Sequence, residues 1–262
     1  MSKVYFVGAG PGDPELLTLR ARRLISEADT ILYAGSLVNP DILKWAKEGA
    51  RIQDTAKMTL EEIIKAMVAD ALQGRQVVRI HSGDPSIYGA IFEQMVELEK
   101  YRISFDIVPG VSSWSAAAAA LRQELTLPNI SQTVILTRRG GRTLVPQKER
   151  LSLLASHNAT MVIFLSMGMI REVVSELMEH YRGDTPAAVV YRASWPDQKI
   201  LRGKLSEIAG QTEREGIKRQ ALIIVGDVLD PILRSMESAP RSLLYDEDFS
   251  HGYREAQGED EN

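Results

Sequence analysis

The sequence predicts an α/β protein with two domains, and two features of its 262 residues support this prediction. In the first half, short apolar runs alternate with segments in which apolar residues recur at helical spacing, which is typical of a mostly parallel sheet covered by helices. The pattern breaks at residues 125–130 and restarts with an apolar run at 133–136. We therefore expect domains at residues 1–124 and 125–246, followed by a tail at 247–262.

The first half contains five strand-like runs. We expect strands at residues 4–7, 30–34, 51–52, 77–80 and 105–108, and helices over 16–25, 42–45, 92–98 and the alanine run at 116–120. A further helix begins after Thr59, because Glu62 three residues later completes a capping box.

The central stretch is residues 77–89, an apolar run that passes through Ser82 and Gly83 into a helical pattern. Asp84 followed by Pro85 suits the N-cap and the first residue of a helix. Ligands of open α/β sheets bind at such strand ends, so we expect this turn to face a ligand. The alternative is that Asp84 only caps a helix.

A glycine loop, GAGPGDP, follows the first strand at residues 8–14. A dinucleotide-binding loop would need a third glycine where Asp13 stands, and the strand at residues 30–34 ends without an acidic partner for a ribose. The sequence therefore disfavours a nicotinamide cofactor. The glycines still let a ligand approach the backbone, although a tight turn without a ligand is the alternative.

In the second half, apolar runs predict strands at residues 133–136, 160–165, 187–191, 199–202 and 221–225, with the fourth antiparallel to the third. The first of them ends in TRRGGRT, which contains Arg138, Arg139 and Arg142. Guanidinium groups among glycines favour binding of carboxylates, and a solvated basic turn is the alternative. In the tail, aromatic residues with His251 and Arg254 indicate a docking segment or a plain edge segment, and the acidic end at 255–262 predicts disorder.

Composition excludes several classes of function. The chain has 31 Lys and Arg against 35 Asp and Glu, a net charge of -4, so no global positive field recruits nucleic acid or an anionic membrane. Cysteine is absent, which excludes disulfides and thiolate chemistry and fits a reducing cytoplasm. The four histidines are scattered, so no metal site is expected. Without a signal peptide or a membrane-spanning run, we expect a soluble cytoplasmic protein whose reaction depends on positioning.

Several motifs together resemble the tetrapyrrole methyltransferases that methylate precorrins. They are GAGPGD at 8–13 with LLT at 16–18, GDP at 83–85 with Tyr88 and Gly89, and Pro109 with Gly110. Four segments resemble, more narrowly, the precorrin-4 carbon-11 methyltransferases: YAGSLV at 33–38, QTVILTR at 132–138, YRASWPD at 191–197 and HGYR at 251–254.

The resemblance implies two α/β domains, a homodimer, and S-adenosylmethionine bound in a cleft between the domains as methyl donor. It implies methyl transfer to carbon 11 of precorrin-4 or cobalt-precorrin-4 in cobalamin biosynthesis, with no catalytic base assigned. Carried over by position, the donor-binding residues are Pro11, Ser82, Gly83, Asp84, Ile87, Ser112, Ser113, Met167 and Ala193. The residues expected to steer the acidic tetrapyrrole are Arg138, Arg139, Arg142, His251 and Arg254.

Three alternatives stay open. Other precorrin or uroporphyrinogen methyltransferases share the fold, as do diphthine synthases and methyltransferases of ribosomal RNA, so the fold alone does not decide the acceptor. The negative charge disfavours RNA. A different class is a nucleotide-binding regulatory module with a degenerate site, which the GDP turn and the Pro109 and Gly110 loop argue against.

Overall fold

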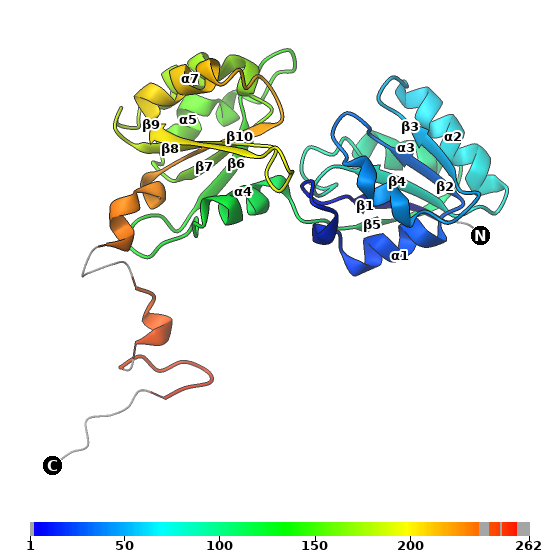
Figure 1. The fold of residues 1–262 in the computed structure, drawn as a ribbon, viewed down its shortest axis with the longest axis horizontal. Coiled ribbons are helices and arrows are strands. Elements are labelled where there is room, and N and C mark those ends of the chain that lie inside the picture. The colour runs from blue at the N-terminus through cyan, green and yellow to red at the C-terminus, as the bar shows by residue number, and fades with distance from the viewer. Residues whose placement is uncertain (1–2, 236–240, 247, 256–262) are drawn as a thin grey trace. The chain divides into compact units, whose positions relative to one another are not determined.

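The computed structural model describes residues 3–235, 241–246 and 248–255 (Figure 1). Contacts divide the chain into two compact units, Met1–Ala120 with Arg192–Lys199, and Leu121–Tyr191 with Ile200–Asn262. The end that the sequence predicts to be disordered lies outside the described residues, apart from Glu255.

The first unit contains a parallel sheet of five strands in the order β3-β2-β4-β1-β5. The strands are β1 (Lys3–Gly8), β2 (Thr30–Tyr33), β3 (Arg51–Asp54), β4 (Val77–His81) and β5 (Ser104–Val108). Gly8 pairs with His81 and Val7 with Val108, so β1, β4 and β5 end at the same level. The loops that follow these three strands therefore leave the sheet side by side.

Helices cover both faces of this sheet (Figure 1). Leu24 and Ile25 of α1 (Leu19–Glu27) pack with Val7 and Ile80 on one face. On the other face, α2 (Leu60–Leu72) and α3 (Phe92–Lys100) bury Met67 and Leu98. The predicted capping box of Thr59 and Glu62 is confirmed at the start of α2. The alanine run lies in α4 (Ser113–Leu121), as predicted, and the expected short helix near residue 42 is the 3-10 helix Pro40–Trp45.

The second unit contains a mixed sheet in the order β6-β7-β10-β8-β9. Its strands are β6 (Val134–Arg138), β7 (Thr160–Phe164), β8 (Pro186–Tyr191), β9 (Lys199–Lys204) and β10 (Ala221–Val225). β6 and β7 are parallel, whereas β10 is antiparallel to β7 and β8. The predicted pairing of the 199–202 run with the preceding strand is confirmed, because β8 and β9 are neighbours.

A hydrophobic core joins one face of this sheet to three helices. Alternate residues of β7, β8 and β10, among them Ile163, Val189 and Ile223, pack against α5 (Leu151–Ala155), α6 (Ile170–Leu177) and α7 (Leu205–Arg214). The remaining short helices are 3-10 turns at Pro14–Leu16, Gln147–Glu149, Met167–Met169, Asp227–Leu229, Pro231–Arg234 and Leu243–Tyr245. Two α/β units with a parallel and a mixed sheet confirm the predicted fold class. No helix within the described residues is both long and apolar enough to cross a membrane.

Candidate functional site

Three loops meet at the carboxyl edge of the first sheet, and the backbone itself joins them. The N–H of Gly83 donates to the carbonyl of Gly10 at 2.8 Å, and the N–H of Gly10 donates back to Gly83 at 3.2 Å. The N–H of Ala9 donates to the carbonyl of His81 at 2.8 Å. The glycine loop after β1 and the turn after β4 therefore form one hydrogen-bonded unit.

The loop after β5 approaches this unit at backbone contact distance. A Cβ atom added to Gly110 would lie 2.3 Å from the carbonyl oxygen of Gly83, and one added to Gly8 would lie 2.7 Å from Gly110 N. Real Cβ atoms do not approach backbone so closely, so both positions require glycine. Gly83 has room for a Cβ but a φ of 62°, which is the left-handed conformation that glycine adopts without strain.

Asp84 connects the turn after β4 to the loop after β5. Its Oδ2 accepts the N–H of Gly110 at 2.9 Å, and its Oδ1 accepts the N–H of Ser86 at 2.8 Å together with the Ser86 hydroxyl. Burial acts to raise the pKa of this carboxyl, but the hydrogen bonds from Ser86 and Gly110 together outweigh it and hold the pKa below its ordinary value. Asp84 is therefore an ionised carboxylate that joins two loops.

The prediction that Asp84 and Pro85 start a helix is wrong. The chain forms a turn over residues 85–88, and α3 begins only at Phe92. Tyr88 and Ala90 have φ values of 54° and 49°, which a right-handed helix does not allow. A Cβ on Gly89 would lie 2.1 Å from the carbonyl oxygen of Pro85, so the turn folds back on itself.

The structure brings most of the predicted donor residues together in the first unit. Eight of the nine belong to it: Pro11, Ser82, Gly83, Asp84, Ile87, Ser112, Ser113 and Ala193. Met167 belongs to the second unit, where its side chain is buried in the core. Within the described part of the chain, the hydroxyl groups of Ser82, Ser112 and Ser113 have no hydrogen-bond partner. These hydroxyls are free to bind a polar ligand at the strand ends.

Segment 192–199 supports the glycine loop, a role that sequence reasoning missed. The indole Nε1 of Trp195 donates to the carbonyl of Pro11 at 2.8 Å, and the Asp13 N–H donates to Oγ of Ser194 at 2.9 Å. A Cβ on Gly12 would lie 2.0 Å from Trp195 Nε1, so the ring occupies the space that this glycine leaves. The separation of these residues in the chain left no local signal for the contact.

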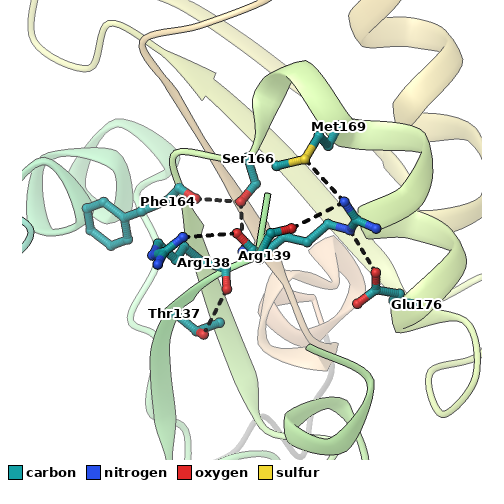
Figure 2. A network of polar contacts seen from close by, with 8 residues as sticks. Thr137, Arg138, Arg139, Phe164, Ser166, Met169 and Glu176 are labelled. Atoms are coloured by element: carbon teal, nitrogen blue, oxygen red, sulfur yellow. Dashed lines mark hydrogen bonds and ion pairs between the residues drawn. The ribbon is translucent and has the colours of Figure 1, made fainter. Parts of the chain in front are cut away.

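The predicted substrate arginines lie at the end of β6 in the second unit, and two of them have partners there. Figure 2 shows Arg139 directed toward Glu176 and Met169. Its Nε donates to the Glu176 carboxylate at 2.7 Å, and its backbone N–H donates to Oγ of Ser166 at 2.9 Å. Arg139 therefore joins the loop after β6 to the loop after β7.

Arg138 and Arg142 differ in whether their guanidinium groups have hydrogen-bond partners. Arg138 donates to the carbonyls of Thr143 at 3.1 Å and Leu144 at 2.8 Å, which closes the arginine loop at residues 138–144. Arg142 is exposed, and within the described residues its guanidinium has no partner. Of the three arginines, Arg142 has the side chain that is free to bind an anion.

The two predicted residues of the tail organise the tail itself. Arg254 donates through Nη2 to the carbonyls of Leu244, Asp246 and Phe249, and its backbone pairs with that of His251. Nδ1 of His251 accepts the Tyr253 N–H at 3.3 Å. Among the described residues there is no group of three His, Asp or Glu side chains arranged to hold a metal ion.

Comparison with known proteins identifies the family. Residues 3–209 match the model of the tetrapyrrole (corrin/porphyrin) methylases. Cobalt-precorrin-4 C(11)-methyltransferase of Methanocaldococcus jannaschii is 56% identical over 255 residues, which are 97% of this chain and 96% of that protein.

Solved structures agree with this match. The X-ray structure of a cobalt precorrin-4 methyltransferase, a cobalamin biosynthetic enzyme, has a TM-score of 0.86 and 47% identity over 87% of this chain and 96% of its own. Uroporphyrin-III C-methyl transferase of Thermus thermophilus, solved in complex with S-adenosylhomocysteine, has a TM-score of 0.72 and 29% identity over 87% of this chain and 99% of its own. The chain belongs to the tetrapyrrole (corrin/porphyrin) methylases.

Proposed function

We propose that the protein transfers a methyl group from S-adenosylmethionine to carbon 11 of precorrin-4 or cobalt-precorrin-4, giving the corresponding precorrin-5 in cobalamin biosynthesis. The observation that carries this proposal is the near full-length similarity to a cobalt-precorrin-4 C(11)-methyltransferase at 56% identity. The alternatives within the fold are less favoured, since the uroporphyrin-III enzyme is only 29% identical.

The carboxyl edge of the first sheet fits the methyl donor. S-adenosylmethionine carries a carboxylate, an amine, a ribose and an adenine, all of which need hydrogen-bond partners. Ser82, Ser112 and Ser113 offer hydroxyls without partners in the described chain, and they follow the strand ends that Gly8, Gly83 and Gly110 bring into contact. These loops contain no lysine or arginine that could bind a pyrophosphate. We assign the donor to this edge.

The residues of the chain act by positioning. The donor supplies a methyl group on a positively charged sulfur, and its C–S bond breaks as the new bond to carbon 11 forms. The electron pair comes from the conjugated system of the tetrapyrrole, which then releases a proton, so no side chain needs to act as the nucleophile. Asp84 holds the two loops against each other, and alignment of the reactants with exclusion of water then lowers the barrier.

Turnover tests the proposal. Purified protein is incubated without oxygen with labelled S-adenosylmethionine and either precorrin-4 or its cobalt form, and the product is analysed by mass spectrometry and carbon NMR. We expect one added methyl group, at carbon 11, and comparison of the two acceptors identifies the preferred one. A methyl group at carbon 1, 17 or 20 would contradict the assignment of the acceptor position and leave the family unchanged.

Asp84→Asn is expected to weaken donor binding about tenfold, because the amide nitrogen cannot accept a hydrogen bond and either Gly110 or Ser86 loses its partner. Titration calorimetry with S-adenosylhomocysteine measures the affinity. Asp41→Asn, at an exposed aspartate of the same unit, is the control and should bind normally. If Asp84→Asn fails to fold, the carboxylate has a structural role and the binding role is not supported.

Arg142→Ala is expected to raise the KM for the tetrapyrrole at least about tenfold, since a charge-assisted hydrogen bond contributes about 1.5–3 kcal/mol. Donor affinity should not change. Arg219→Ala removes an exposed arginine elsewhere in the same unit and should leave both constants unchanged. Arg138→Ala and Arg139→Ala should change the KM for the tetrapyrrole by altering the conformation of the arginine loop, since both side chains make hydrogen bonds that hold it. An unchanged KM in Arg142→Ala would remove this residue from the substrate site.

We further propose, from the family resemblance, that the enzyme is a homodimer, and from its lack of cysteine that it works in the cytoplasm. Light scattering coupled to size-exclusion chromatography measures the mass against that of the 29.1 kDa chain. Fractionation of the producing cells tests the compartment.

A further inference from the structure

A group of buried polar side chains lies directly beneath the turn after β4. Arg79 and His81 of β4 and Gln94 of α3 are each 5% exposed or less. Side chains alternate along a strand, so Arg79 and His81 share the face of Val77, which packs against α2 and α3. The methyl-transfer reaction proposed above uses none of the three. Burying charged and polar groups costs free energy, so we expect these three side chains to have a role.

Gln94 connects the buried arginine to the end of the turn. Arg79 Nε donates to Oε1 of Gln94 at 3.2 Å, and Nε2 of Gln94 donates to the carbonyl of Ala90 at 2.8 Å. His81 makes a hydrogen bond with the backbone of Gly89, the residue before Ala90. Two of the three buried side chains therefore hold the last residues of the turn.

The turn needs such support. Tyr88 and Ala90 both have positive φ, and Gly89 packs against the carbonyl of Pro85. Residues with side chains keep this conformation only where their surroundings determine it. The same turn begins with Ser82, Gly83 and Asp84, which we assign to the donor. A change in the backbone conformation of Ala90 would therefore alter the conformation of residues 82–84, because they belong to the same turn.

The amide of Gln94 both accepts a hydrogen bond from Arg79 and donates one to the Ala90 carbonyl, which a carboxylate could not do. Within the described residues Arg79 forms no ion pair, and burial lowers its pKa to about 10. A glutamate at this position would pair with the buried cation. It would, however, have no hydrogen to donate to the Ala90 carbonyl. Gln94 therefore makes a hydrogen bond to the turn at a position where a glutamate would form an ion pair with Arg79.

We propose that Gln94, held from below by Arg79, is a positioning residue that keeps residues 82–90 in the conformation that binds the methyl donor. This inference rests on the proposed function, because it concerns the same donor site. Its contribution to donor affinity is separate from its contribution to folding, since the contact that acts on the donor is the bond to Ala90.

Gln94→Glu separates these two contributions. The variant gains an ion pair with Arg79 and loses the bond to Ala90, so we expect a melting temperature equal to or above that of the wild type. We expect the Kd for S-adenosylhomocysteine and the KM for S-adenosylmethionine to rise about tenfold, with kcat at saturating donor nearly unchanged. Gln132→Glu, the same change at an exposed glutamine, is the control and should match the wild type.

Hydrogen exchange supplies a second readout that does not depend on turnover. Amides of residues 86–91 should exchange faster in Gln94→Glu, while those of β1 should not change. Gln94→Met, which removes both hydrogen bonds and retains the volume, should also weaken donor binding. Wild-type affinity in Gln94→Glu would overturn the inference, as would parallel loss of stability, affinity and kcat in both variants. Failure of the wild type to bind the donor would instead reject the proposed function.

Discussion

Gly110→Ala is expected to abolish measurable donor binding and to lower the free energy of unfolding of the first unit by about 3 kcal/mol. The added Cβ would lie 2.3 Å from the Gly83 carbonyl oxygen and 2.9 Å from Gly8 Cα, and both are backbone atoms that no rotamer change can move. The three loops would have to separate at the edge of the sheet to which we assign the donor. Titration calorimetry and thermal unfolding measure the two effects.

Gly183→Ala is the matched control for this substitution. A Cβ added there would lie 3.6 Å from its nearest atoms, in Met178 and Ser206, which is ordinary van der Waals contact. We expect this variant to retain both affinity and stability. Donor affinity of Gly110→Ala within twofold of the wild type, an amount of about 0.4 kcal/mol, would show that the loops are not held together as described.

His81 is expected to make the first unit strongly sensitive to acid. Burial, followed by the nearby charge of Arg79, lowers the pKa of His81 to about 3, although its hydrogen bond with Gly89 acts to raise it. In the unfolded chain the ring titrates near its ordinary pKa of about 6.5. Between these values the unfolded state binds a proton that the folded state does not. Stability should therefore decrease as pH falls from 6.5 toward 3, by about 1.4 kcal/mol per pH unit.

His81→Gln removes this titration and retains a side chain that can donate a hydrogen bond. Urea unfolding at pH 8, 6 and 4.5 compares it with the wild type and with His157→Gln, which changes an exposed histidine. At pH 8 we expect His81→Gln to be the less stable protein, and the difference should shrink by about 3 kcal/mol by pH 4.5. Parallel pH profiles for His81→Gln and the wild type would contradict the buried, neutral state of His81.

Local patterns were sufficient for most elements of the fold. Apolar runs such as residues 77–80 and 221–225 are strands, and Thr59 with Glu62 does cap α2. These predictions depend on the periodicity of burial and on the chemistry of helix ends, both of which act over a few residues. The turn after β4 was the exception. Asp84 and Pro85 have the composition of a helix start, but the hydrogen bond from the Gly110 N–H to Asp84 and the backbone conformation of Tyr88 and Ala90 prevent a helix there.

The predicted sites show the same division. The donor residues were carried over from the family resemblance, and the structure brings eight of the nine into one unit. The role of each arginine did not follow from TRRGGRT, because nothing in the motif indicates that Glu176 and the carbonyls of residues 143 and 144 are close by. The contact of Arg79 with Gln94 was not predicted, because no local pattern connects a strand residue to a helix residue fifteen positions later.

The sequence by itself determined the α/β class, the order of the strands along the chain and the family. The class and the strand order depend on residue types and spacings within single segments, and the family depends on motifs spread along the chain. Only the tertiary structure decided that Gly8, Gly83 and Gly110 touch, that Trp195 fills the space beside Gly12, and that Gln94 supports Ala90. These contacts join residues distant in the chain, and their existence depends on distances of a few tenths of an ångström that no local pattern encodes.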